Sequence, residues 1–247
     1  MKSLKIILVT ILLLSTVACS DTENTNGVIT INFTHNWGGE KITTADFNEL
    51  KYTNKHGNIL SVSKLKYLVS NISLQASNGN AIELKDYFLV DVTNNNTSFT
   101  FLNVPFGAYS NTSFTFGFNA NDNIDGIYTD LNASSWNWPE MLGGGYHFMQ
   151  FEGKYKENEN ENPFTLHMGT AKIGQDEFEE NHFQVTIILN EFTVSNNTSL
   201  EIEMDVSEWF KNPNIWDLNA YNINLMPNYE AQKMMNQNGR SVFSYNQ

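Results

Sequence analysis

Hydrophobic and polar residues alternate in short runs along almost the whole chain, and this pattern constrains the fold more than any other feature. The first run places Ile29, Ile31 and Phe33 on one face of a segment and polar residues on the other. Alternation with a period of two is typical of a β-strand with one buried face. Eight similar runs follow, at 67–74, 87–92, 98–104, 114–118, 146–152, 164–168, 183–189 and 200–206. The pattern predicts an all-β fold, an antiparallel β-sandwich of about nine strands with Greek-key or immunoglobulin-like topology.

Two segments have helical character instead. Asn228 is a typical N-cap for a helix over 229–238, with Gly239 as its stop, and a second short helix is expected to begin at Ser207 and to end before Pro213. Residues 28–247 are therefore expected to form a single β-sandwich domain with a short C-terminal helix.

The first eighteen residues have the features of a bacterial export signal. Two lysines precede the apolar run 6–14, which is too short to span a membrane, and small residues then lead to Cys19. Cys19 is the only cysteine in the chain. This arrangement resembles a lipobox, so we expect residues 1–18 to be a lipoprotein signal peptide and Cys19 to carry the lipid. An ordinary signal peptide with an incidental cysteine is the alternative.

The segment 19–27 is polar and acidic and is expected to tether the domain to the membrane through the lipid. These features predict an outer-membrane lipoprotein of the cell envelope. Acidic residues directly after the cysteine, Asp21 and Glu23, resemble the signal that sends some Bacteroidetes lipoproteins to the cell surface.

Charge and motif content exclude several functions. The chain has 14 basic and 27 acidic residues, a net charge of −13, so it has no basic patch with which to bind nucleic acid. The common hydrolase, metalloprotease, phosphate-loop and dinucleotide motifs are missing, and we expect no catalytic residues and no enzymatic activity. The segment from Asn121 to Gly126 imitates the start of a calcium loop, but Asn132 stands where that loop needs glutamate, which favours a plain turn.

Two groups of histidines lie on predicted strands. Extending the first strand along its odd-numbered face brings His35 and then Trp37 to the apolar side. If 146–152 and 162–168 form a hairpin centred on Glu157, His147 and His167 lie directly opposite each other, with Cβ atoms about 5 Å apart. Two imidazoles in an apolar setting suit copper or zinc better than calcium or magnesium. His56 is expected in a turn, and His182 is a weaker ligand candidate.

Six segments resemble the MbnP-like family, which is related to the methanotroph copper proteins MopE and CorA, and identify the chain as a Bacteroidetes-type lipoprotein member. They are FTHNWGG at 33–39, LKYLVSNI at 65–72, WNWPEMLGGGYHFMQFEG at 136–153, FTLHMG at 164–169, WFKNP at 209–213 and NGRSVF at 238–243. Together they extend over essentially all of the mature chain, and the Gly-Gly-Tyr-His segment with its preceding Trp-x-Trp is the most specific.

The resemblance implies copper as the cofactor, held by histidines together with an oxidised tryptophan. His35, His147 and His167 stand in the histidine-bearing motifs, and Trp37, Trp136 and Trp138 are the tryptophans near enough in sequence to be oxidised. It also implies a partner, a dihaem peroxidase of the MbnH type that oxidises the tryptophan.

We therefore expect an envelope lipoprotein that binds copper. The competing interpretation is a surface module that binds glycan or protein without a metal, since exposed aromatic residues on an acidic sandwich also suit sugars. Convergence of His35, His147 and His167 favours copper, whereas dispersed histidines and a planar row of tryptophans favour glycan.

Overall fold

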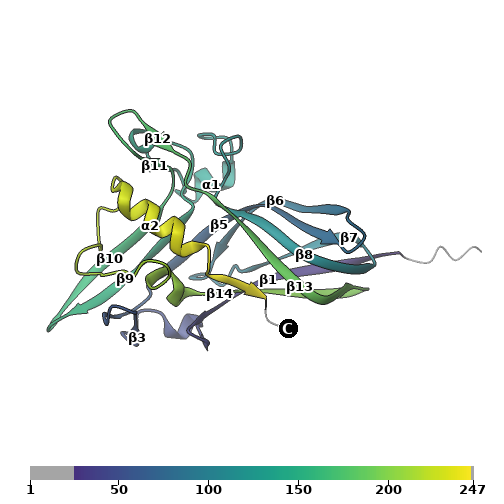
Figure 1. Cartoon of the computed structure of the whole chain (residues 1–247), viewed down its shortest axis with the longest axis horizontal. Helices are drawn as coiled ribbons and strands as arrows, with labels where there is room; N and C mark the ends of the chain where they lie inside the picture. The colour runs from purple at the N-terminus through teal and green to yellow at the C-terminus, as the bar shows by residue number, and fades with distance from the viewer. Residues whose placement is uncertain (1–24, 246–247) are drawn as a thin grey trace, which may run out of the picture.

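Nine long strands form the body of the molecule in a computed structural model that describes residues 25–245 (Figure 1). Each lies over one of the nine runs predicted from the sequence, although the ends differ by several residues. The strands are β1 (Asn26–Trp37), β5 (Lys64–Ala76), β6 (Ala81–Asp91), β7 (Ser98–Pro105), β8 (Gly107–Phe116), β9 (Met149–Glu157), β10 (Asn160–Met168), β13 (Phe183–Val194) and β14 (Asn197–Asp205).

The strands form two main sheets that pack as a β-sandwich. The five-stranded sheet has the order β15-β14-β1-β2, with β7 also paired to β1. The eight-stranded sheet has the order β13-β8-β5-β9-β4-β3, with β6 paired to β5 and β10 to β9. The antiparallel expectation holds for the recorded strand pairs except β1 with β14, which is parallel.

Short strands that the pattern of hydrophobic runs did not predict complete the sheets. They are too short to show an alternation of their own, and they are held by neighbouring strands. These strands are β2 (Glu40–Lys41), β3 (Tyr52–Thr53), β4 (Ile59–Leu60), β15 (Phe243–Tyr245) and the separate pair β11 (Ala171–Lys172) and β12 (Phe178–Glu179).

Aromatic side chains fill the space between the two sheets. Ile29, Ile31 and Phe33 of β1 are at most 2% exposed, as the alternation predicted. The Phe33 ring meets Tyr67 edge-on at 6.0 Å and Phe114 at 5.9 Å between centroids. Such edge-to-face contacts between rings of opposite sheets fix how the two layers sit on each other.

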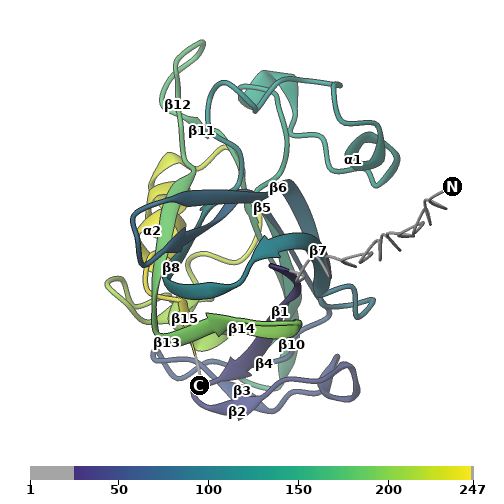
Figure 2. The same ribbon diagram turned by 90° about the vertical axis from the view of Figure 1, so that its right-hand side faces the viewer.

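The predicted C-terminal helix is α2 (Tyr229–Gly239), and the Asn228 side chain caps it by accepting a hydrogen bond from the Ala231 amide. The second predicted helix is the 3₁₀ turn η3 (Val206–Phe210), whose N-cap is Asp205 and not Ser207. Three further short helices, α1 (Thr129–Ala133), η1 (Thr44–Asp46) and η2 (Glu140–Leu142), lie in connections. Figure 2 shows the loop that carries α1 above β5 and β6. None of the helices in the part of the chain described here has the length and hydrophobicity needed to cross a bilayer.

The predicted tether ends earlier than expected, because β1 already begins at Asn26. Asn26 pairs with Pro105 and Gly27 with Val104. Cys19 and the signal peptide lie outside the described residues, so the predictions made for them are not tested by the fold.

Candidate metal-binding site

His147 and His167 are brought together, with ring centroids 5.3 Å apart and an angle of 79° between the rings. The register behind the prediction is nevertheless wrong. His167 pairs with Gln150 and Asn160 with Glu157, so each pairing partner is shifted by three residues and the hairpin is centred between Asn158 and Glu159.

The reason for the shift is the turn. Only Asn158 and Glu159 separate the two strands, and Asn158 has φ of 54°. Two-residue hairpin loops need such left-handed residues, and asparagine adopts this conformation more readily than most. Of the acidic segment 157–161, only Asn158 and Glu159 lie in the loop, and the other three residues belong to the strands.

A break in the alternation at the start of β9 places His147 beside His167. The neighbours Phe148 and Met149 are both buried in the sandwich core. On β10, Leu166 and Met168 face that core, so His167 between them faces outward. Because two successive residues of the β9 segment turn inward, His147 also comes to the outer face of the sheet.

Each of the two imidazoles has one ring nitrogen already bonded. Nδ1 of His147 lies 3.1 Å from the carbonyl oxygen of Trp136. Nε2 of His167 lies 2.9 Å from Oε1 of Glu152, an oxygen that also accepts a hydrogen bond from Nζ of Lys64 at 2.7 Å. These two bonds occupy Nδ1 of His147 and Nε2 of His167, so a ligand would bind the other nitrogen of each ring.

Electrostatics keep both imidazoles neutral near pH 7. Burial lowers the pKa of His147 to about 4, with a contribution from the neighbouring His167. Burial also lowers the pKa of His167, against the opposing effect of Glu152. Burial alone would raise the pKa of Glu152, but hydrogen bonds from Lys64 and His167 outweigh it and lower the pKa. Neutral imidazoles offer the lone pairs that a metal needs.

Two tryptophans pack against His147. The His147 ring lies 5.6 Å from Trp136 and 5.0 Å from Trp138 between centroids, and both indoles are at most 2% exposed. Trp138 donates its indole N–H to the carbonyl of Leu142 at 3.0 Å and packs over Gly169, where a side chain would clash with the ring. The buried indole N–H of Trp136 has no hydrogen-bond partner among the described residues.

Glycines and the loop 121–126, whose sequence resembles the start of a calcium loop, position the segment before His147. Gly143, Gly144 and Gly145 all have φ between 66° and 107°, a conformation that other residues rarely adopt. Asp125 accepts a hydrogen bond from the Gly145 amide at 2.6 Å, and Asn123 accepts one from the Tyr146 amide at 2.9 Å. These side chains serve as backbone caps, as expected of a turn.

His35 is not part of this cluster. It lies on the core face of β1, 4% exposed, with Nε2 3.0 Å from the Tyr67 hydroxyl. His35 faces the interior of the sandwich from the five-stranded sheet, whereas His147 and His167 lie on the outer face of the eight-stranded sheet. Across residues 25–245, no three His, Cys, Asp or Glu side chains are arranged to hold a metal ion, so the expected three-histidine centre is not formed.

The remaining candidates are elsewhere. Trp37 reaches the core edge as expected, where it stacks on Tyr52 at 4.8 Å and packs against Phe210. His56 pairs with Asp217 at 3.4 Å and His182 with Glu180 at 3.4 Å. Sequence reasoning missed Glu152 and Lys64, which the correct register of three strands places beside His167.

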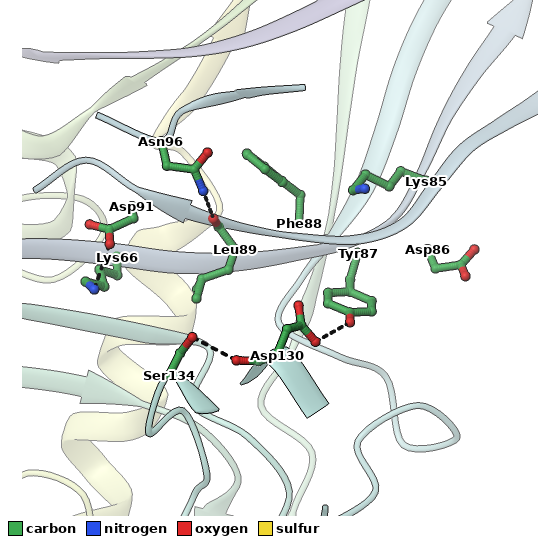
Figure 3. Close-up of a pocket in the computed structure, with 10 residues that line it drawn as sticks. All are labelled: Lys66, Lys85, Asp86, Tyr87, Phe88, Leu89, Asp91, Asn96, Asp130 and Ser134. Atoms are coloured by element: carbon green, nitrogen blue, oxygen red, sulfur yellow. Dashed lines mark hydrogen bonds and ion pairs between the residues drawn. The ribbon is translucent and has the colours of Figure 1, made fainter. Parts of the chain in front are cut away.

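A polar pocket of about 440 Å³ opens on the same outer face, one strand away from β9 (Figure 3). Residues of β6 form its floor, and Asp130 and Ser134 of the α1 segment form one wall. Its polar groups largely bond to one another: Tyr87 donates to Asp130 at 2.6 Å, and Lys66 pairs with Asp91 at 2.7 Å.

Comparison with known proteins agrees with the fold. The family model described as MbnP matches residues 26–228, which include all nine long strands and end at the residue that caps α2. The structure is similar to that of MbnP from Methylosinus trichosporium, with a TM-score of 0.55 and 14% identity over 77% of this chain and 79% of that chain. At this level of identity the structural match shows the fold alone. The search of curated proteins gave no match.

Proposed function

Because the chain belongs to the MbnP family, we propose that it binds copper through His147 and His167. The role we propose is copper uptake, storage or homeostasis in the cell envelope, without a chemical reaction of its own.

The observation that carries this proposal is the pattern of hydrogen bonds around the two imidazoles. Histidines that bind metals usually donate the other ring N–H to a carboxylate or a backbone carbonyl, which fixes the tautomer and the ring orientation. His167 has a carboxylate partner, Glu152, and His147 has a carbonyl partner, that of Trp136. Two neutral nitrogen donors in an apolar setting fit copper better than calcium or magnesium.

A third donor would come from one of the two tryptophans that contact His147. Trp136 and Trp138 both qualify by proximity, whereas Trp37 stacks on Tyr52 at the edge of the core. Of the two, Trp136 has the unbonded indole N–H. A dihaem peroxidase of the MbnH type is the proposed source of the oxidation.

We further propose that the protein is an outer-membrane lipoprotein attached through Cys19. The support is the order of the N-terminal segments, a basic head, a short apolar run and small residues before the single cysteine. Cys19→Ala is expected to leave the precursor unprocessed or to release the protein from membranes.

Copper titration of the purified protein tests the proposed site. Wild type is expected to retain copper after desalting, to prefer it over zinc and to leave calcium unbound. His147→Ala and His167→Ala are each expected to lose most of the affinity, while His56→Ala and His182→Ala serve as matched controls and retain it. Equal copper retention by wild type and both site variants would refute the assignment.

The polar pocket is the one feature that favours the competing function, binding of a glycan without a metal. It presents the Tyr87 ring together with Lys85, Asp86 and Asn96, groups that suit a sugar (Figure 3). Among residues 25–245, however, no planar row of exposed tryptophans is found: Trp37 is half-buried, and Trp136, Trp138, Trp209 and Trp216 are buried. Protein from native envelopes that holds no copper would favour this alternative.

A further inference from the structure

The end of the sandwich at which β1 begins has a composition unlike the rest of the chain. Three turns meet there, between β5 and β6, between β7 and β8, and between β13 and β14 (Figure 1). Backbone hydrogen bonds join them to each other and to the first strand: Phe106 to Thr25 at 2.8 Å, Val28 to Asn196 at 2.9 Å and Ser77 to Ala108 at 2.9 Å.

The three turns at this end have no charge. The segments 76–82, 104–110 and 194–198 contain neither acidic nor basic residues, although 17% of the residues in the chain are charged. The opposite end in Figure 1 has the tip of the β9–β10 hairpin, with Glu157, Glu159 and Glu161. The three turns at this end are therefore uncharged, although Asp21 and Glu23 precede the first strand in the sequence.

An apolar pocket of about 390 Å³ opens at the uncharged end. Its walls come from Ala76, Ile82, Pro105, Ala108 and the exposed ring of Phe106, among others. The hydroxyl of Tyr109, which also lines the pocket, already donates to the carbonyl of Pro105 at 2.9 Å. The pocket thus presents mainly apolar surface to whatever enters it.

We infer that this end of the sandwich rests on the lipid bilayer, with Phe106 inserted at the boundary between headgroups and acyl chains. The inference depends on the proposed attachment through Cys19. Cys19 lies six residues before Thr25, and six residues of chain reach at most about 20 Å, so the anchor holds this end close to the membrane.

Charge favours this end as the one that faces the bilayer. An anionic membrane repels an acidic protein, and the uncharged turns reduce that repulsion here, although Asp21 and Glu23 of the tether retain some of it. An aromatic ring gains free energy at the interface, and the apolar pocket beneath it can take up part of an acyl chain. The acidic hairpin then points away from the membrane.

Depth measurements on the full-length, lipid-modified protein test the inference. Because Cys19 is blocked by its lipid, Phe106→Cys introduces the single reactive thiol, which is labelled with an environment-sensitive fluorophore. Met141→Cys is the matched control, since Met141 is an apolar residue that is 73% exposed at a different part of the surface. Both proteins are reconstituted in phosphatidylethanolamine and phosphatidylglycerol vesicles that contain doxyl-labelled lipid, and their thermal unfolding is compared with that of wild type.

The label at position 106 is expected to be quenched several-fold more than the label at position 141. Equal quenching at the two positions, in protein that floats with the vesicles, would overturn the inference and leave the lipid anchor intact. Protein that does not float with the vesicles would overturn the anchor and the inference together. Stronger quenching at position 141 would show that a different face contacts the membrane.

Discussion

The two sheets hold histidines in opposite settings, one on the inner face of the five-stranded sheet and two on the outer face of the eight-stranded sheet. On the inner face, His35 is buried between the two sheets with the Tyr67 hydroxyl as its partner, and burial lowers its pKa to about 3. On the outer face, His147 and His167 meet each other, with a backbone carbonyl and a carboxylate on their other nitrogens. His35 is therefore a packing residue, whereas the hydrogen bonds of His147 and His167 fit the ligand role proposed for them.

The largest expected effects are opposite ones: His35→Ala should lose stability and keep copper, and His147→Ala should lose copper and keep most of its stability. His35→Ala should lower the free energy of unfolding by about 2–4 kcal/mol, because it leaves a cavity and a buried Tyr67 hydroxyl without its partner. It should leave copper binding unchanged. His147→Ala should do the reverse and lose copper with a smaller loss of stability. Chemical denaturation and copper retention are measured for both variants. Loss of copper in His35→Ala with an intact fold would contradict the assignment of His35 to packing alone.

A second prediction concerns pH. Above pH 6.5 His35 is neutral in the folded and unfolded states, and its protonation does not affect stability. As the pH falls from 6.5 toward 3, the unfolded chain takes up a proton that the folded chain does not, so stability is lost. The loss is on the order of 3–5 kcal/mol at the acid end.

Denaturation curves of wild type and His35→Gln over this range measure the effect. Carboxylates titrate in both proteins, so the difference between the two curves isolates His35. Glutamine keeps a hydrogen-bonding group near Tyr67 but takes up no proton. Parallel curves for the two proteins would contradict the buried, neutral state of His35.

A smaller effect is expected from the carboxylate partner of His167. Glu152→Gln should weaken copper binding by about 10- to 100-fold, because the partner that orients the ring loses its charge. Lys64→Met, which removes the other ion-pair partner of Glu152, is the control and should weaken copper binding less. A competition assay against a chelator measures both. Unchanged copper affinity in Glu152→Gln would show that the contact with the His147 ring alone positions His167.

The sandwich could be predicted from the sequence because its signal is local. Each long strand has its own alternation, and the first strand correctly brought His35 and Trp37 to the core side. The cap at Asn228 likewise located α2. The parallel pairing of β1 with β14 could not be predicted in this way, since strand direction leaves no mark in the alternation.

The site was only partly predictable, because it depends on register and on a break in the pattern. The hairpin turn at Asn158 and Glu159 moved the pairing by three residues. The successive inward residues Phe148 and Met149 then returned His147 to the face of His167. The contact between His147 and His167 was thus predicted from the wrong register, and Glu152 was not predicted to be part of the site.

X-ray absorption at the copper edge counts the imidazoles bound to the metal and so tests the proposed two-histidine site. Two imidazoles per copper are expected in wild type and in His35→Gln, and fewer in His147→Ala and in His167→Ala. Three imidazoles in wild type with one lost in His35→Gln, or a spectrum that neither outer-face substitution changes, would contradict the two-histidine site.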